Sequence, residues 1–203
     1  MRKFISSLSV IAVILILLPG CQGTVTSDGQ TIISYEEFIQ LAWEAFEGKD
    51  FPTAVTHFKD AKNVNVNRTE AYTGLGWSYL QLDSLVSALN EFAICASLND
   101  PQANLHAGWA FALNAQKEYE KSNEQADEAL HLDANWAFGH GLSIGVIQLQ
   151  LLKAENYFLL GLFLESLTQV QLVNSTFTAD VATDEGKAAL SAEIERLKTG
   201  SES

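Results

Sequence analysis

The stretch that decides the fold is residues 69–95, TEAYTGLGWSYLQLDSLVSALNEFAIC, which alternates small and bulky side chains at helical spacing. Gly76 and Ala88 are small, whereas Tyr79 and Phe92 are large and aromatic. Two antiparallel helices approach closely only where side chains are small, and bulky residues fill the spaces beside those crossings. The stretch therefore predicts two helices that pack against each other and are joined by a short turn.

The same pattern recurs before and after this stretch with a period of 34 residues. Counting units from Tyr35, Thr69 and Ala103 aligns small residues with small ones, and large apolar residues mostly with large ones. The aligned sets, at positions 8, 11, 17, 20, 24 and 27 of the units, are Ala42, Gly76 and Ala110; Ala45, Tyr79 and Leu113; Phe51, Leu85 and Tyr119; Ala54, Ala88 and Ser122; Phe58, Phe92 and Ala126; and Ala61, Cys95 and Ala129. A fixed period of this length is typical of a repeat protein.

This pattern resembles the tetratricopeptide repeat, whose units carry small residues at positions 8, 20 and 27 and aromatic or apolar residues between them. A fourth unit starts at Ile147 after a shift of ten residues, and a last segment with helical spacing follows. The resemblance implies an all-α fold, a right-handed α-solenoid of about four helix pairs plus a C-terminal helix that caps the end of the stack. The predicted domain is 35–199, with repeats at about 35–68, 69–102, 103–136 and 147–180, an insertion at 137–146 and the capping helix at 184–198.

The N-terminal segment predicts export and lipid anchoring. Residues 1–20 begin with two basic residues and continue with an apolar run that is too short for a comfortable transmembrane helix, which is typical of a signal peptide. Leu18-Pro19-Gly20-Cys21 resembles the bacterial lipobox, which implies thioether lipidation of Cys21, cleavage before it and acylation of its new amino group. Residues 21–34 would then be the lipidated cysteine and a tether. An ordinary cleaved signal or an uncleaved anchor is the alternative.

Three further features of the sequence bear on the class of partner and on the cellular location. They are the net charge, the cysteine content and the residue after the lipobox. The net charge of −13 at pH 7 argues against nucleic acid, which calls for clustered Lys and Arg. Cys95 is the only other cysteine, so a lipidated Cys21 leaves no disulfide framework. We expect a lipid-anchored protein of the cell envelope. Gln22 in place of Asp favours, by resemblance to Gram-negative lipoproteins, the periplasmic face of the outer membrane in such an organism.

No group of residues in the sequence predicts catalysis, a metal site or a cofactor, and we expect a protein that is not an enzyme. Residues 141–145 spell G-x-S-x-G, but a nucleophile elbow needs a strand before Ser143 and a histidine after it, and the last histidine is His140. We interpret the motif as part of a glycine-rich loop. The four histidines show neither H-E-x-x-H nor pairing at helical spacing, so no metal ligand set is predicted.

An aromatic stripe on the first helices of the units is the candidate binding surface. In the tetratricopeptide family, positions 2, 5, 9, 12 and 13 of the first helix line a concave groove in which ligands lie. By that resemblance the partner-binding residues are Trp43, Phe46, Trp77, Leu80, Phe111, Asn114 and Phe158. Aromatic anchors in an apolar trough suit an extended or helical peptide. Alternatively, the stripe packs as core, or is covered in cis by the tether or by the 184–198 helix.

Two functions fit these features. The first is a membrane-anchored scaffold of the bacterial cell envelope that binds a partner protein or peptide in the concave groove. The second is a lipoprotein that binds a small ligand, glycan or lipid, in a pocket bounded by the insertion 137–146 and the apolar run Tyr157–Leu164. The oligomeric state is left open, because the apolar second helix of the fourth unit suits either a core or a dimer face.

Overall fold

The computed structural model describes residues 24–25 and 31–200, and the chain divides into two compact units, 1–33 and 34–203. In the first unit, strands β1 (Thr24–Val25) and β2 (Thr31–Ile32) pair antiparallel, with Thr24 opposite Ile32. Only a tether was expected here, and this short strand pair was not predicted. The predicted signal peptide, 1–20, and the lipidation candidate Cys21 lie outside the described residues.

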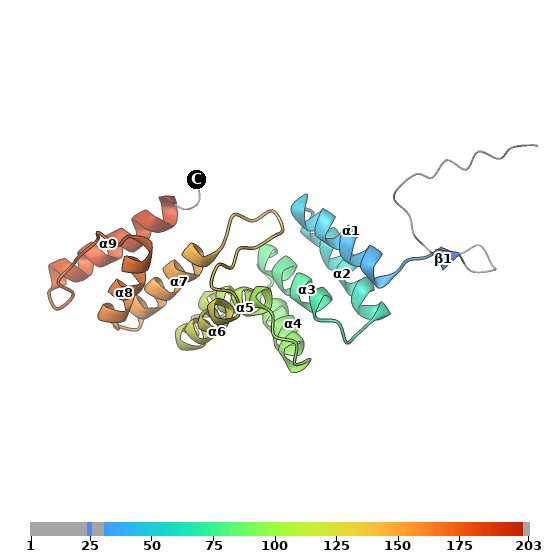
Figure 1. Ribbon diagram of the computed structural model, residues 1–203, viewed down its shortest axis with the longest axis horizontal. Helices are drawn as coiled ribbons and strands as arrows, with labels where there is room; N and C mark the ends of the chain where they lie inside the picture. The colour runs from blue at the N-terminus through green and yellow to red at the C-terminus, as the bar shows by residue number, and fades with distance from the viewer. Residues whose placement is uncertain (1–23, 26–30, 201–203) are drawn as a thin grey trace, which may run out of the picture. The chain divides into compact units, whose positions relative to one another are not determined.

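In the second unit, the described residues 34–200 form four helix pairs and a final helix (Figure 1). The first helices of the first three pairs start at Tyr35, Thr69 and Ala103, the residues from which the 34-residue units were counted. The fourth starts at Val146, one residue before the expected Ile147. The helices are α1 (Tyr35–Glu47), α2 (Phe51–Val64), α3 (Thr69–Gln81), α4 (Leu85–Ser97), α5 (Ala103–Ala115), α6 (Tyr119–Leu132), α7 (Val146–Leu159), α8 (Phe163–Val173) and α9 (Asp184–Gly200). The predicted fold class, an all-α solenoid, is confirmed.

The turn inside each pair recurs as regularly as the helices. One residue in each turn has a left-handed backbone, with φ of 61° at Lys49, 53° at Asp83, 64° at Lys117 and 76° at Gly161. These residues all occupy position 15 of their units. In the second pair Asp83 N donates to Leu80 O and Ser84 N donates to Tyr79 O, which is the Schellman pattern that ends a helix. The chain is thereby reversed within three residues, and the two helices of a pair are held antiparallel.

The helices cross where small residues meet large rings. Phe92 of α4 lies between Gly76 of α3 and Gly108 of α5, and a Cβ added at these glycines would come within 2.3 Å and 2.5 Å of its ring. Phe58 of α2 lies against Gly74 in the same way. The aligned small residues are fully buried: Ala42, Ala54, Ala61, Ala88, Cys95, Ala110, Ser122, Ala129 and Ala154. The prediction that small residues mark the helix crossings is therefore confirmed.

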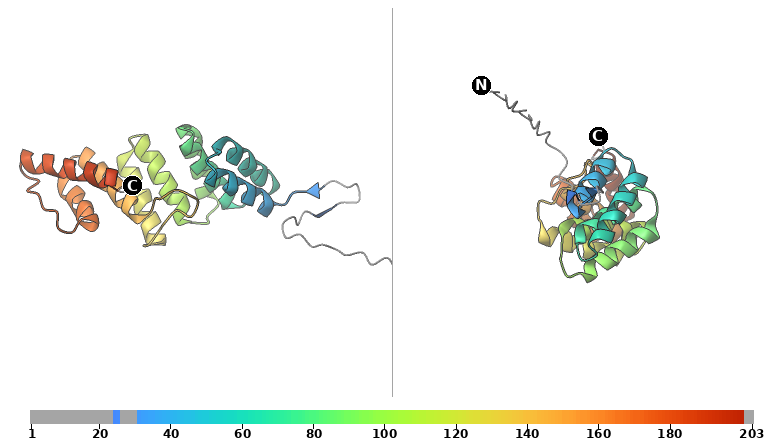
Figure 2. Two further views of the ribbon diagram at one scale, coloured as in Figure 1. Left: turned by 90° about the horizontal axis from the view of Figure 1, so that it is seen from above. Right: turned by 90° about the vertical axis from the view of Figure 1, so that its right-hand side faces the viewer.

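The first helices of the pairs form an inner layer. α1 contacts α3, α3 contacts α5 and α5 contacts α7, whereas among the described pairs the successive second helices do not contact one another. A stack whose one layer is more closely spaced than the other curves towards the closer layer. The concave face of the second unit is therefore made by α1, α3, α5 and α7, and Figure 2 shows the pairs following one another along it.

The last helix covers the open end of the fourth pair. Leu190 and Ile194 of α9 are buried against Ala154, Leu167 and Val170. At the same contact Glu193 accepts hydrogen bonds from Arg196 and from Asn174, and the bond from Arg196 is the main reason that the pKa of this carboxyl is lowered.

Among the residues that the structure describes, none of the helices combines the length and apolar character needed to cross a bilayer.

Candidate functional site

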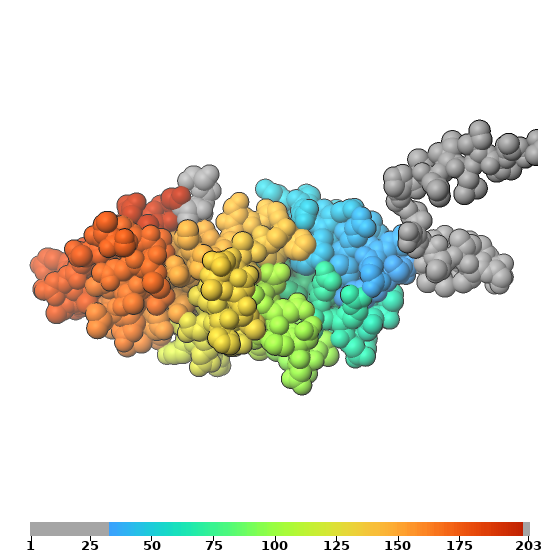
Figure 3. All heavy atoms as spheres, viewed as in Figure 1, coloured from blue at the N-terminus to red at the C-terminus, as the bar shows by residue number. Residues whose placement is uncertain are grey.

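The insertion between α6 and α7 divides the predicted groove in two. Its ends are joined by an antiparallel bridge between Ala137 and Gly145, where Phe138 N donates to Ile144 O and Val146 N donates to Trp136 O, both at 2.9 Å. From this closed base the loop extends along the inner face to the end of α1. A Cβ added at Gly141 would lie 3.5 Å from the Cα of Glu47, and Figure 3 shows the insertion, in yellow-orange, against α1, in blue.

Phe138 of the insertion fills the N-terminal part of the groove. The centroid of its ring lies 4.4 Å from that of Trp77, 5.8 Å from that of Phe46 and 6.1 Å from that of Trp43. Beneath it, Trp43, Phe46 and Trp77 are only 8%, 1% and 2% exposed. Trp43 and Phe46, which the resemblance placed in an open groove, are therefore covered in cis. The covering segment is the insertion, and not the tether or the 184–198 helix that were the expected covers.

His140 lies flat on the indole ring of Trp43 in the same stripe. The two rings are stacked with centroids 3.6 Å apart and planes 4° apart. Its Nδ1 lies 3.1 Å from Glu47 Oε1, so a protonated His140 would donate to this carboxylate and also make a cation–π contact with the indole. The indole Nε1 of Trp43 donates to Glu70 at 3.2 Å. Trp43 thus finds partners for both its ring and its N–H within the domain.

Trp136 anchors the base of the insertion in the core. Its Nε1 donates to the side-chain oxygen of Asn104 at 2.7 Å, and Trp77 Nε1 donates to the backbone oxygen of the same residue at 3.0 Å. The two indoles lie 6.4 Å apart and nearly parallel. Because Asn104 belongs to α5 and Trp77 to α3, this contact fixes the loop base to both helices.

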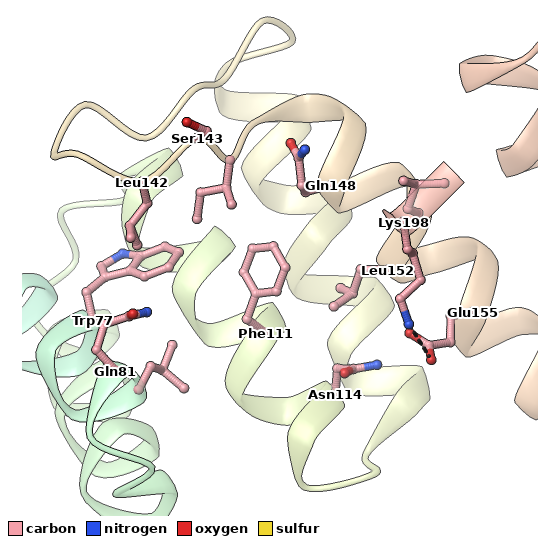
Figure 4. Close-up of a pocket in the computed structure, with 13 residues that line it drawn as sticks. Trp77, Gln81, Phe111, Asn114, Leu142, Ser143, Gln148, Leu152, Glu155 and Lys198 are labelled. Carbon is pink, nitrogen blue, oxygen red and sulfur yellow. Dashed lines mark hydrogen bonds and ion pairs between the residues drawn. The ribbon is translucent and has the colours of Figure 1, made fainter. Parts of the chain in front are cut away.

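A pocket of about 570 Å³ is left on the inner face beyond the insertion. Figure 4 shows it between the insertion and Trp77 on one side and the α7–α9 contact on the other, with Phe111 of α5 in the middle. Much of its wall is apolar, formed by Trp77, Leu80, Phe111, Leu142, Leu151 and Leu152. Side-chain amides of Gln81, Asn114 and Gln148 lie at its edge. An apolar wall with a few fixed polar groups is the usual composition of a binding pocket.

The polar edge of the pocket is held in place by buried hydrogen bonds. Asn114 Nδ2 donates to Asn156 Oδ1 at 2.6 Å, and the fully buried Asn156 donates in turn to Ser122 and Asn123 at 2.9 Å each. This network links α5, α6 and α7. Buried hydrogen bonds of this kind fix side-chain orientation, so Asn114 is preorganised at the pocket edge.

The far end of the pocket is closed by an ion pair from the last helix. Lys198 Nζ of α9 donates to Glu155 Oε1 of α7 at 3.0 Å (Figure 4). Both side chains are about one-third exposed, so solvent weakens the pair and its net contribution to stability is small. Its role in the pocket is to place one cation and one anion beside the apolar wall, in addition to the amides at the edge.

Comparison with known proteins identifies the fold. No protein-family model and no curated protein matches this chain. Solved structures do: YrrB, described as a TPR protein with an unusual peptide-binding site, matches with a TM-score of 0.62 and 14% identity over 80% of this chain and 86% of its own. TTC0263, a TPR protein of Thermus thermophilus, matches with a TM-score of 0.56 and 16% identity over 82% of both chains. MamA matches with a TM-score of 0.57 and 16% identity over 68% of this chain and 74% of its own. The chain folds as a tetratricopeptide-repeat solenoid.

Within this tetratricopeptide-repeat solenoid, the seven predicted groove residues lie in three places. Trp77, Leu80, Phe111 and Asn114 line the pocket. Trp43 and Phe46 lie beneath the insertion, as described above. Phe158 packs edge-on against Phe163 at 5.2 Å in the separate cluster beside α9. The stripe is thus partly pocket and partly core, because the repeats place the residues on one face while the insertion and α9 decide which of them stay open.

The insertion carries the functional residues that sequence reasoning missed. Trp136 and Phe138 precede its glycines, and an aromatic pair of this kind in an inter-repeat connection is a signal that the connection packs on the domain. As the small-ligand hypothesis expected, the insertion lines the pocket, through Leu142, Ser143 and Ile144. The run Tyr157–Leu164, expected as a second wall, does not line the pocket. Its Phe158 and Phe163 pack instead in the cluster beside α9.

The G-x-S-x-G motif lies in the bridged loop and not on a strand-to-helix elbow. Ser143 is exposed at the pocket edge, and the residues before it make the loop tip rather than a strand. Within the described part of the chain, no group of three or more His, Cys, Asp or Glu side chains is arranged to hold a metal ion.

Proposed function

We propose that this chain is a membrane-anchored scaffold of the bacterial cell envelope that captures a protein or peptide segment in the pocket between α3, α5 and α7, without catalysing a reaction. The observation that carries the proposal is the open pocket of about 570 Å³ on the concave face, with an apolar wall and side-chain amides at its edge, of which Asn114 is held by Asn156. YrrB, which has the same fold, is described as having a peptide-binding site. One fold can support many functions, so the pocket is stronger support for the proposal than the likeness to YrrB.

The pocket suits one or two bulky apolar side chains of a bound segment. Burying each side chain of this kind contributes about 1.5–3 kcal/mol, and Phe111, Leu151 and Leu152 provide the surface for it. Gln81, Asn114 and Gln148 have amide groups that can bond to the backbone of the segment on either side of the anchor. Hot-spot residues of this type carry most of the binding energy of an interface.

The anchor would keep the pocket close to the membrane. The lipobox resemblance places lipid on Cys21, and the roughly twelve residues that follow span at most about 40 Å when extended. In a Gram-negative organism we place the protein at the periplasmic face of the outer membrane. The partner would then be another envelope protein that presents an apolar segment near this surface.

The test is site-specific photo-crosslinking in the native envelope. A photoreactive phenylalanine analogue at Phe111 is expected to crosslink to a partner, whereas the analogue at the exposed Asn90 of α4 serves as the control on the outer helix layer. A synthetic peptide from the crosslinked segment should bind the purified protein, and Phe111→Ala should weaken it about 30- to 150-fold, equivalent to about 2–3 kcal/mol. Equal crosslinking at both positions would contradict the proposal.

A small ligand is the second candidate, because the pocket volume also falls in the range of small-molecule sites. A glycan would use the ring of Phe111, and an acyl chain would use the leucines of α7. A thermal-shift screen against glycans and fatty acids separates the two functions. Stabilisation by one of these ligands, together with no crosslinked protein at Phe111, would favour the small-ligand function.

A further inference from the structure

The insertion covers the inner face although the stack does not need it. α6 packs on α7 as α4 packs on α5, so the third and fourth repeats join across the insertion in the ordinary way. The connection between α4 and α5 is made by residues 98–102, whereas residues 133–145 connect α6 and α7. The additional residues are the ones that run back along the groove to α1. The additional residues therefore bind in cis to a surface that the repeats already form without them.

The contacts of the insertion are those of a bound peptide. Phe138 enters a niche formed by the rings of Trp43, Phe46 and Trp77, and only 6% of it is exposed. Two residues later, His140 stacks on Trp43 and lies 3.1 Å from Glu47. A ligand that makes the same contacts needs an aromatic residue and, two positions later, a basic residue that can face the Glu47 carboxylate.

We propose that the inner face of α1 and α3 is a second binding site, covered here by the insertion acting as an internal ligand, and that it takes a peptide with an aromatic residue two positions before a histidine or another base. The aromatic residue would replace Phe138 in the niche, and the base would replace His140 between Trp43 and Glu47. This deepens the proposed function by naming the peptide class for the covered half of the groove. The two sites share Trp77, whereas Trp43, Phe46 and Glu47 belong to the covered site and Phe111 and Asn114 to the pocket.

The loop is built so that its tip can leave while its base stays. The base is fixed by the Ala137–Gly145 bridge and by the hydrogen bond of Trp136 to Asn104. The tip contains Gly139, which has open space beside its Cα, and Gly141, whose φ is +74°. A segment tethered at both ends competes with a free peptide at a high effective concentration, so the covered site binds a free peptide weakly until the tip is displaced.

The experiment supplies the insertion as a free peptide. The probe is a fluorescein-labelled peptide with the sequence of residues 137–144, AFGHGLSI, and binding is measured by fluorescence anisotropy. One variant of the full chain has 138–143 replaced by Gly-Ser-Gly, and a second keeps the loop length and carries Phe138→Ala with His140→Ala. We expect both variants to bind the probe at least about tenfold more tightly than the unaltered chain.

Matched controls make the result specific. A probe with alanine in place of its Phe and His should lose binding, and Glu47→Gln in the shortened variant should weaken binding several-fold, because the base of the probe loses its carboxylate partner. Failure of the intact probe to bind either variant, while circular dichroism shows native helix content, overturns the proposal. So does loss of helix content in both variants, since the insertion would then be a structural part of the core. Crosslinking at Phe111 in the unaltered chain reports on the pocket alone, so the two proposals fail independently.

Discussion

At the scale of single residues, Phe92 sets the spacing of three helices. Its ring is fully buried and rests on Gly76 of α3 and on Gly108 of α5, so it cannot move away from one helix without meeting the other. Neither glycine is needed for an unusual backbone angle, because both lie inside helices with no positive φ. Their role is to leave room for the ring.

Gly76→Ala should therefore destabilise the domain although alanine is the better helix former. Alanine favours a helix over glycine by about 1 kcal/mol, but its Cβ would lie 2.3 Å from the Phe92 ring, and overpacking a core costs about 1–3 kcal/mol. We expect a net loss of up to about 2 kcal/mol in the free energy of unfolding, measured by urea denaturation. The control is Gly139→Ala, where nothing lies within 4 Å of an added Cβ and the change should be under about 0.5 kcal/mol. Equal losses in the two variants would contradict this account of Phe92.

Tyr35 makes the stability of the folded chain depend on pH in the alkaline range. It is buried, accepts a hydrogen bond from Ala71 N at 3.2 Å and lies under the guanidinium of Arg68. Burial is the main cause that raises the pKa of its hydroxyl from 10.0 to about 12, and the nearby carboxylate of Glu70 adds to this shift. The folded chain thus keeps the proton up to about pH 12, whereas the unfolded chain loses it near pH 10.0.

The stability contributed by Tyr35 is accordingly complete below pH 10.0 and is lost as the pH rises from there to about 12. In a titration of tyrosinate absorbance, we expect one of the five tyrosines to ionise about two pH units after an ordinary tyrosine. Tyr35→Phe should remove this late component. Ionisation of all the tyrosines near pH 10.0 in the folded wild-type chain would show that the prediction is wrong.

At the scale of elements, the sequence predicts helices far better than it predicts what covers them. Helix starts at Tyr35, Thr69 and Ala103 follow from a period that every repeat must obey, because each crossing needs a small residue at the same place. The insertion obeys no period. Its course depends on whether Phe138 finds a niche among Trp43, Phe46 and Trp77, which are far away in the chain and come together only after the repeats have stacked.

The same reason explains the partial success with the binding surface. Family positions correctly group Trp77, Leu80, Phe111 and Asn114 on one inner face, since helical spacing fixes the face. They cannot show that Trp43 is closed by His140, which lies 97 positions later in the chain and in a segment without an equivalent in the other repeats. Tertiary contacts of a single loop therefore decide which part of the stripe is open.

The capping helix should stabilise the fourth pair locally. Leu190 of α9 is fully buried against Ala154, Leu167 and Val170, so Leu190→Ala should cost about 2–4 kcal/mol. Repeats contact mainly their neighbours, so we expect hydrogen exchange to become faster in α8 and α9 while α1 to α4 keep their protection. Leu164→Ala makes the same chemical change at a side chain that is 66% exposed and should alter exchange little. Uniform loss of protection in all the helices would contradict a local role for α9.

At the scale of the whole molecule, the net charge argues against electrostatic attachment to a membrane surface. Cleavage before Cys21 would remove two basic residues and no acidic residue, which changes the net charge from −13 to −15. A chain of this charge is repelled by anionic lipid headgroups. If the chain is cleaved before Cys21, we expect attachment through acyl chains, and stable attachment takes more than one of them.

Labelling of growing cells with an alkyne-bearing fatty acid tests this anchor directly. We expect the label on the wild-type chain and on Cys95→Ser, because Cys95 is buried between α3 and α4, where it bonds to Thr73 and to the backbone of Thr69. We expect Cys21→Ser to lose all of the label, since both the thioether and the acylated amino group depend on this cysteine. Mass spectrometry of the wild-type chain should show that residues 1–20 are absent and that the first residue carries the added lipid mass. Label that persists in Cys21→Ser would contradict lipidation at Cys21, and a wild-type chain that keeps residues 1–20 would support an uncleaved anchor instead. The pocket would then act at whichever membrane retains that anchor, and the binding experiments at Phe111 and Glu47 would keep their meaning.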